Sequence, residues 1–270
     1  MGSSIDKKLL VSLTFDDALE VHLDVAIPLL NEMNFQGTFF INLNASGFSN
    51  HLLTWREVAQ QGHELGNHTI FHPAVSSKNY ISEGNALENY TLDRMRIELK
   101  TANQLLKAID GQAKRTFAYP CANPILGKAG WVKRSLKKIG LEKTRIAGWV
   151  EKFPILDLFS GERNYSILMP EFFFAARGGG FSEDRELKIN NERFNVPCVS
   201  ADGLHLEELI SVVERFKCEG NWLVFMFHGI GGGHHLKCEF EDFKQLLNKL
   251  KSDEDIRLMT FRNAAKLLWG

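Results

Sequence analysis

Short apolar runs alternate with amphipathic segments along most of the chain. Residues 9–15 are typical of a buried strand, residues 22–33 have the spacing of a helix, and residues 37–42 form a second strand-like run. Strands that alternate with helices in this way favour a mostly parallel sheet or barrel with helices on its faces. The pattern therefore predicts an α/β fold.

The same alternation continues to the C-terminus. Between Asn89 and Gly111 apolar residues recur at spacings of three and four, which predicts an amphipathic helix that ends at Gly111. Thr54, with Glu57 three residues later, has the signature of an N-cap for a shorter helix, and a strand then leads toward His68. Further strands are expected at residues 116–120, 145–150, 172–177, 194–200, 221–229 and 256–261, and further helices at 127–139, 204–218, 240–250 and 262–269.

Nothing in the sequence divides this pattern into separate domains. No internal repeat and no low-complexity linker divides the 270 residues. One catalytic domain spanning residues 1–270 is expected, with an irregular excursion at about residues 151–197, around the run RGGGFSEDRE.

Composition narrows the class of protein. The apolar share of 44% and the charged share of 24% are those of an ordinary soluble globule. A net charge of -1 gives no electrostatic case for a nucleic-acid partner or an anionic membrane, and no apolar run approaches the roughly 20 residues of a membrane-spanning helix. The first residues, MGSSIDKK, lack the apolar stretch of a secretion signal, so a cytoplasmic location is expected if this terminus is native, and an extracytoplasmic one if a signal was removed.

The four cysteines stand far apart in the sequence and form no C-x-x-C pair. A four-cysteine metal site is therefore not expected, and free, mostly buried thiols are the favoured interpretation.

Polar side chains collect where three of the expected strands end. Asp16 and Asp17 follow the first strand, His68 and His72 follow the third, and His228 ends the most apolar one. Because the C-terminal ends of parallel strands gather at one edge of a sheet or barrel, these side chains are expected to share a site. Taken alone, each has a plainer interpretation: Asp17 as a helix cap beside a solvated Asp16, and His228 as a core histidine.

Two histidines separated by three residues, together with one carboxylate, make a metal-binding set with open coordination positions. Zinc in such a set lowers the pKa of bound water to about 7 and polarises a carbonyl oxygen. The second carboxylate is then available as a base, and a histidine that titrates near neutrality suits proton delivery to a leaving nitrogen.

Four stretches together resemble the motifs of the polysaccharide deacetylases, the NodB-homology proteins of carbohydrate esterase family four. They are LTFDDA, QGHELGNHTIFHP, TFAYP and VFMFHGI, and the resemblance covers about residues 10–230. It implies a distorted (β/α) barrel that removes N-acetyl groups from amino sugars or their polymers with a divalent metal, often zinc.

Carried over residue by residue, the resemblance implies that Asp16 is the catalytic base and His228 the catalytic acid. Asp17, His68 and His72 fall on the metal ligands. Cobalt, manganese or nickel could replace zinc, because availability as much as ligand type decides occupancy.

The third motif departs from the family pattern. The family commonly reads Phe-Arg-Pro-Pro-Tyr, where the arginine orients the base, whereas residues 117–121 here are Phe-Ala-Tyr-Pro-Cys. Ala118 therefore stands in the place of the arginine, and Arg177 is the candidate replacement among the catalytic residues. Tyr119 and Pro120, next to the expected site, are candidate substrate contacts.

Two further stretches leave questions open. The family's fourth motif, usually acidic with a tryptophan, is not evident, so a substrate other than chitin or peptidoglycan is open. In the run GIGGGHH, His234 and His235 either line the site or, in the favoured interpretation, are exposed loop residues.

The leading hypothesis is an enzyme that hydrolyses an amide bond of a carbohydrate substrate with a divalent metal. One alternative keeps the machinery but acts on small cyclic amides, ureides or formyl groups. Another is a carbohydrate-binding protein with a silent site. The sugar, the native metal and the oligomeric state are not determined by the sequence.

Overall fold

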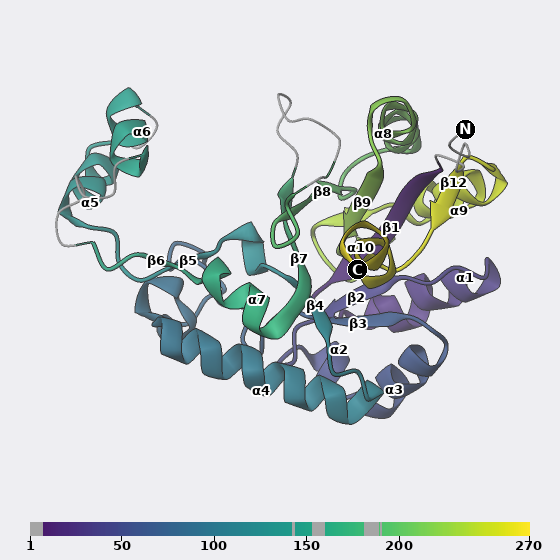
Figure 1. The fold of residues 1–270 in the computed structure, drawn as a ribbon, viewed down its shortest axis with the longest axis horizontal. Coiled ribbons are helices and arrows are strands. Elements are labelled where there is room, and N and C mark those ends of the chain that lie inside the picture. The colour runs from purple at the N-terminus through teal and green to yellow at the C-terminus, as the bar shows by residue number, and fades with distance from the viewer. Residues whose placement is uncertain (1–7, 142–143, 153–159, 181–188, 190) are drawn as a thin grey trace.

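The computed structural model describes residues 8–141, 144–152, 160–180, 189 and 191–270, and within them seven parallel strands close a barrel (Figure 1). In order around the barrel, they are β1 (Leu9–Asp16), β2 (Thr38–Ile41), β3 (Glu64–Asn67), β4 (Arg115–Ala118), β7 (Phe173–Gly180), β8 (Val196–Ser200) and β9 (Trp222–Phe227). Pairing of β9 with β1 completes the ring, and β12 (Ile256–Leu258) joins the first residues of β1. The predicted α/β barrel is confirmed.

Helices cover the outside of the barrel (Figure 1). They are α1 (Ile27–Glu32), α2 (Ser46–Ser49), α3 (Leu52–Gln60), α4 (Leu92–Asp110), α7 (Met169–Phe172), α8 (Leu206–Glu219) and α9 (Phe240–Ser252). A further helix, α10 (Phe261–Trp269), packs instead against the residues that fill the barrel, with Phe261 in contact with Phe40 of β2 and Trp222 of β9. A π-helical turn, η1 (His22–Ala26), precedes α1. Short strands pair as β5 (Ile125–Leu126) with β6 (Arg163–Asn164) and as β10 (Gly229–Ile230) with β11 (Lys237–Cys238).

The alternation of side chains along β1 separates two layers. Leu13 and Phe15 belong to the hydrophobic cluster between the barrel wall and the helices. Thr14 and Asp16, on the opposite face of the strand, point into the barrel. The last inward position of β1 is thus a carboxylate at the C-terminal end of the barrel.

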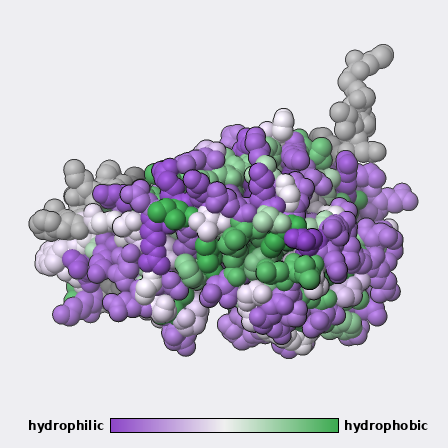
Figure 2. Space-filling view, turned by 90° about the horizontal axis from the view of Figure 1, so that it is seen from below, coloured by the Kyte–Doolittle hydropathy of each residue, from purple (hydrophilic) through white to green (hydrophobic). Residues whose placement is uncertain are grey.

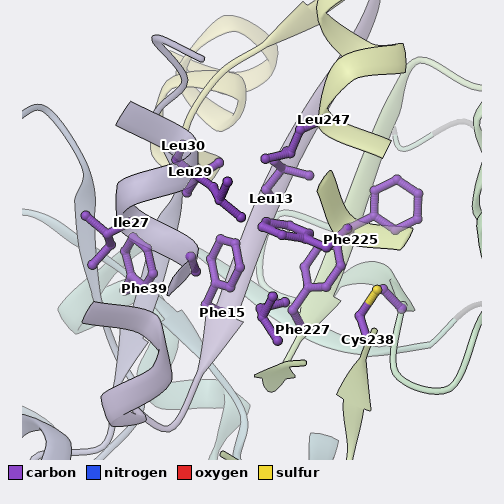
Figure 3. Packing of buried hydrophobic residues seen from close by; sticks show 14 of the residues in the cluster. Leu13, Phe15, Ile27, Leu29, Leu30, Phe39, Phe225, Phe227, Cys238 and Leu247 are labelled. Carbon is purple, nitrogen blue, oxygen red and sulfur yellow. The ribbon is translucent and has the colours of Figure 1, made fainter. Parts of the chain in front are cut away.

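Aromatic rings fill the layer between β1, β2, β9 and the helices (Figure 3). Phe15 stacks on Phe39 of β2, with ring centroids 4.8 Å apart, and on Phe227 of β9, at 5.3 Å. Leu30 of α1 and Leu247 of α9 belong to the same fully buried cluster. Burial of each such side chain stabilises the fold by about 1.5–3 kcal/mol, so this layer fixes the strand that carries the two aspartates.

The long predicted helix forms as expected. Thr91 caps α4 by accepting a hydrogen bond from the amide of Arg94, and Gly111 ends it with a φ of 71°. A left-handed φ of this kind is the usual role of glycine after a helix.

Two expectations about secondary structure are wrong. Residues 145–150 lie in the helix α6 (Arg145–Lys152) and not in a strand, because Ile146, Trp149 and Val150 recur at helical and not at alternating spacing. Thr54 lies inside α3, whose N-cap residue is His51.

The stretch expected to form an irregular excursion, residues 151–197, includes the strands expected at 172–177 and at the start of 194–200. It contains β6, α7, β7 and the start of β8, and residues 153–159, 181–188 and 190 of it lie outside the described residues.

The described part of the surface gives two further observations. No helix in the described part of the chain is both long enough and apolar enough to cross a bilayer. Seen from below the view of Figure 1, the described surface is mostly hydrophilic, with its largest apolar area near the middle (Figure 2). The lower helices α3 and α4 carry exposed apolar side chains that include Leu53, Ile97 and Leu105.

All four cysteines are free thiols, as expected, but only two of the four are buried. Cys198 and Cys238 are buried, whereas Cys121 and Cys218 are exposed.

Candidate metal centre and active site

The two adjacent aspartates converge because the backbone leaves the strand between them. Asp16 is the last residue of β1, and Asp17 and Ala18 then adopt left-handed φ values of 75° and 52°. The turn brings both carboxylates to one imidazole: Nε2 of His68 lies 3.9 Å from Oδ2 of Asp16 and 3.7 Å from Oδ1 of Asp17. Such backbone geometry costs about 1–3 kcal/mol per residue and is typical of functional sites.

The two histidines come from the loop that follows β3. The Nδ1 of His68 donates a hydrogen bond to the carbonyl of Ala118 at 2.8 Å, which leaves its Nε2 facing the aspartates. His72 has a left-handed φ of 48°, and its Nε2 lies 3.3 Å from Oδ1 of Asp17. One ligand atom from each of Asp17, His68 and His72 lies within 4.8 Å of the other two.

A buried glutamate on α4 holds this loop. Oε1 of Glu98 accepts the amides of Ile70 and Phe71, each at 3.0 Å, and Oε2 accepts the hydroxyl of Tyr90 at 2.9 Å. The side chain is 5% exposed, so these hydrogen bonds replace the water that a buried carboxylate has lost. Glu98 thereby fixes the path of the chain between the two histidines.

The three residues fit a divalent cation. Oδ1 of Asp17 is buried and accepts no hydrogen bond within the described residues, so a cation would complete its coordination. Burial lowers the pKa of His68 to about 4, which keeps its imidazole neutral as a ligand must be. A set of two imidazoles and one carboxylate with open positions suits zinc and neighbouring transition metals.

Asp16 is paired with an arginine from another strand. The Nη2 of Arg177 on β7 forms a buried ion pair with Oδ2 of Asp16, and its Nη1 donates to the hydroxyl of Thr14 at 3.2 Å. Burial alone would raise the pKa of Asp16, but the charge of Arg177, followed by His68, lowers it to about 2. The structure therefore brings together Asp16 and the arginine that the sequence singled out.

The register of the sheet explains how Arg177 reaches this place. Arg177 lies directly opposite Ala118 in the pairing of β4 with β7. The two positions are neighbours on the inner wall of the barrel, so a guanidinium from β7 occupies space beside the position where the family motif has one on β4.

His228, just after β9, is held by an aspartate that sequence reasoning missed. The Nδ1 of His228 donates to Oδ2 of Asp202 at 2.6 Å, and its amide donates to Oδ1 at 3.0 Å. Burial opposes the charged imidazole, but the hydrogen bond to Asp202 and the charge of Asp16 outweigh it and raise the pKa of His228. The only sequence signal for Asp202 was an acid just after the predicted strand that is now β8.

His22 is a second residue that sequence reasoning missed. It is fully buried in η1, and its Nε2 donates to the carbonyl of His228 at 2.7 Å while its Nδ1 accepts the amide of Leu19 at 3.2 Å. Burial lowers its pKa to about 4, so it remains neutral at ordinary pH. His22 thus ties the turn after Asp17 to the backbone of His228.

The substrate contacts predicted for Tyr119 and Pro120 are not supported by this geometry. Tyr119 is 3% exposed, and its hydroxyl donates to the carbonyl of Phe194 at 3.0 Å. Its ring packs with Phe117 in the second hydrophobic cluster, and Pro120 is also buried. Both side chains therefore support the site from the core.

The glycine-rich loop after β9 places one of its two histidines against His228. The ring of His234 stacks on that of His228, with centroids 5.3 Å apart and planes 21° from parallel. Gly233 has a φ of 78°, and a Cβ there would lie 2.7 Å from Val21, so the loop requires glycine at this point. His235 is exposed.

Comparison with known proteins gives the family. Residues 4–141, just over half of the chain, match the family model described as polysaccharide deacetylase. The chain belongs to the polysaccharide deacetylase family. A segment of 117 residues is also 31% identical to a gellan lyase from Bacillus sp., and it covers 43% of this chain but only 4% of that much longer protein.

Solved structures share the fold of this polysaccharide deacetylase family member. A Mycobacterium smegmatis protein provisionally described as a polysaccharide deacetylase superposes with a TM-score of 0.60 at 13% identity, over 99% of this chain and 92% of the other. A CE4 family pseudoenzyme from Bacillus anthracis superposes with a TM-score of 0.52 at 16% identity, over 96% of this chain and 66% of the other. At these identities the likeness concerns the fold alone.

Proposed function

We propose that this chain is a metal-dependent hydrolase that removes the acetyl group from an N-acetylated amino sugar or its polymer. Membership of the polysaccharide deacetylase family supports the class of reaction. In this proposal Asp17, His68 and His72 hold one divalent ion, most simply zinc, while Asp16 is the base and His228 the acid.

The observation that carries the proposal is the second carboxylate. Asp16 is 3% exposed, lies beside the three candidate ligands and is kept ionised by Arg177, yet its Oδ1 accepts no hydrogen bond within the described residues. Burying an oxygen without a donor is costly unless another group uses it. A water molecule that gives up its proton to this oxygen is such a group, whereas a site that only binds sugar does not need it.

A divalent ion held by these residues polarises a carbonyl oxygen and makes water easier to deprotonate. Asp16 takes a proton from water, and the water oxygen forms a bond to the acetyl carbonyl carbon. His228, oriented through Nδ1 by Asp202, gives the proton on Nε2 to the leaving nitrogen as the carbon–nitrogen bond breaks. The products are acetate and a free amine.

Arg177 orients Asp16 in this proposal, although it lies on β7 and not in the third motif. The guanidinium fixes one carboxylate oxygen and leaves the other for water. We further propose that residues 1–270 form one catalytic domain, because β1 near the N-terminus pairs with β12 near the C-terminus.

Acetate release from a panel of N-acetylated sugars and oligomers tests the proposed function. Metal-stripped protein is assayed with and without added zinc or cobalt, and Asp16→Asn serves as the blank. Metal-dependent acetate that disappears in the blank is the expected result, and it also identifies the sugar class.

Two other outcomes contradict this proposal in different ways. Release of formate, or opening of small cyclic amides, without acetate would retain the machinery and change the substrate. Absence of any turnover with metal bound would favour a carbohydrate-binding protein with a silent site; the structural neighbour from Bacillus anthracis is itself described as a pseudoenzyme.

A further inference from the structure

A helical hairpin projects from the barrel between β4 and β7. It consists of α5 (Trp131–Lys138) and α6, and it lies beyond the short ribbon of β5 and β6, away from the barrel strands (Figure 1). The two helices have a small core of their own, in which Leu136, Val150 and Val132 pack together.

Large apolar side chains of this hairpin point away from its core. Trp131, Ile139, Ile146 and Trp149 are 60%, 66%, 60% and 66% exposed. Ile146 and Trp149 are three residues apart on α6 and therefore share one face of the helix. Single exposed apolar residues are ordinary, but two tryptophans and two isoleucines on one small projection make it a candidate interaction surface.

The same segment concentrates positive charge. Residues 131–152 contain seven lysines or arginines and two glutamates, a formal charge of +5 in a chain whose net charge is -1. The overall charge balance, which gave no case for an anionic partner, therefore conceals a strongly basic hairpin.

We propose that the hairpin docks on the surface of a bilayer that contains anionic lipids. Tryptophan and aliphatic side chains combined with lysine and arginine are the composition of helices that lie in the membrane interface. Sugars stack on aromatic rings but gain little from exposed isoleucines, which disfavours a glycan as the partner. A second copy of the hairpin would bring two strongly positive surfaces together, which disfavours self-association.

The position of the hairpin gives docking a consequence for the whole chain. The chain leaves β4 at Ala118, whose carbonyl holds His68, and reaches α5 through η4 (Pro120–Ala122) and β5. Docking of the hairpin would therefore hold the chain to the bilayer through the segment that follows β4, which starts beside the candidate site at the C-terminal edge of the barrel. The proposal concerns this surface alone and holds whatever the substrate is.

Co-sedimentation with lipid vesicles tests the proposal on the full chain. Vesicles of phosphatidylcholine alone are compared with vesicles that contain about a third of phosphatidylglycerol, at low and at high salt. The expected affinity for the anionic vesicles is at least about tenfold higher, and salt reduces it. Brominated lipids are expected to quench tryptophan fluorescence, because Trp55 and Trp222 are buried while Trp131 and Trp149 are exposed.

Two sets of variants separate the apolar from the charged contribution. Trp131→Ser with Trp149→Ser and, separately, Lys138→Glu with Arg145→Glu are each expected to lower the vesicle affinity at least about tenfold. The charge variants leave the hairpin core intact, so they remain informative if the tryptophan variant unfolds locally. Ile97→Ser with Leu105→Ser on α4 is the matched control, since it removes exposed apolar side chains elsewhere, and it is expected to bind as the parent does.

Several results would overturn the proposal. They are equal binding to neutral and anionic vesicles, no binding to either, or parent-like binding by both sets of hairpin variants. Dimerisation abolished by the tryptophan variant, without vesicle binding, would assign the surface to a second copy. Retention on an anionic polysaccharide such as polygalacturonate, without vesicle binding, would assign it to a glycan.

Discussion

At the scale of single residues, the candidate site depends on a guanidinium that comes from an unexpected strand. Arg177 and Asp16 are both almost fully buried, and Arg177 lies opposite Ala118 across the pairing of β4 and β7. Because both positions face the barrel interior, either strand is placed to supply the arginine. For pairing with Asp16, the direction of the arginine side chain into the barrel matters more than which of the two strands carries it.

Removal of this guanidinium is expected to impair turnover and stability together. Arg177→Ala leaves a buried carboxylate without its partner, so the free energy of unfolding should fall by about 3–5 kcal/mol. The pKa of Asp16 should rise, because burial is no longer opposed, and the acid limb of the kcat/KM profile should move to higher pH. The kcat should fall by about 100-fold or more, measured by acetate release from folded protein.

A second substitution provides the control for this prediction. Ala118→Arg in the Arg177→Ala background should restore part of the lost kcat and part of the lost stability. Parent-like turnover by Arg177→Ala alone would show that Arg177 does not orient the base.

Asp202 is expected to set the alkaline limb of the pH profile. It raises the pKa of His228, so the protonated acid persists above its ordinary range and is lost only as pH rises through the raised value. Asp202→Asn should therefore move the alkaline limb of kcat/KM to lower pH, with the acid limb unchanged. An alkaline limb that stays in place would mean that His228 is not the group that limits activity there.

Some residues of the candidate site could be predicted from the sequence, and others could not. Arg177 could be singled out because Ala118 left a buried base without a cation. Asp202 and His22 could not, since their contacts with His228 join residues far apart in the sequence and belong to no recognised motif. Tyr119 was expected to contact substrate, whereas its side chain is buried, and alternation along β4 with Ala118 facing inward already directs its neighbour outward.

At the scale of elements, the loop after β3 depends on α4. Glu98 on this helix accepts the amides of Ile70 and Phe71, which lie between the two candidate metal ligands of the loop. The helix α4 therefore positions the loop that carries two candidate metal ligands, although no residue of α4 is itself a candidate ligand.

Glu98→Gln is expected to weaken metal binding. The substitution keeps the size of the side chain but replaces a charged acceptor by a neutral one, so the loop is held less firmly. Zinc affinity should fall by about 10–100-fold, measured by competition with a chelating dye. Lys100→Gln, on the exposed side of the same helix, should bind zinc as the parent does, and equal affinities for both variants would contradict the role of Glu98.

Elements with clear periodicity were predictable, and a short ambiguous one was not. The helix over residues 92–110 combined a long apolar repeat with a glycine stop, and both appear in the structure. Residues 145–150 were apolar but too short to separate strand from helix by composition. Their spacing places Ile146 and Trp149 on one face of α6, outside the barrel.

At the scale of the whole molecule, the barrel joins the two ends of the chain. β1 pairs with β2, β9 and β12, so strands from the N-terminal and C-terminal parts of the described chain meet on one strand. The alternation of elements predicted an α/β fold with a parallel sheet or barrel, but the choice of a barrel came from the family resemblance, since periodicity does not show which strands are neighbours.

A cavity in this strand is expected to destabilise the chain as one unit. Leu13→Ala removes a buried side chain from the layer between barrel and helices, so the free energy of unfolding should fall by about 2–5 kcal/mol. Urea unfolding followed by tryptophan fluorescence and by circular dichroism should show a single shifted transition with both probes. Two separate transitions would contradict the proposal of one domain.

The central claim is that one divalent ion, held beside a free buried base, makes this chain a deacetylase. Its most direct test is to titrate zinc into metal-stripped protein while acetate release from the best N-acetylated substrate is measured. The account predicts that activity rises from zero to a plateau at one ion per chain, and that Asp16→Asn binds the same single ion without releasing acetate. Full activity in the metal-free protein, or acetate release by Asp16→Asn at the parent rate, would contradict it.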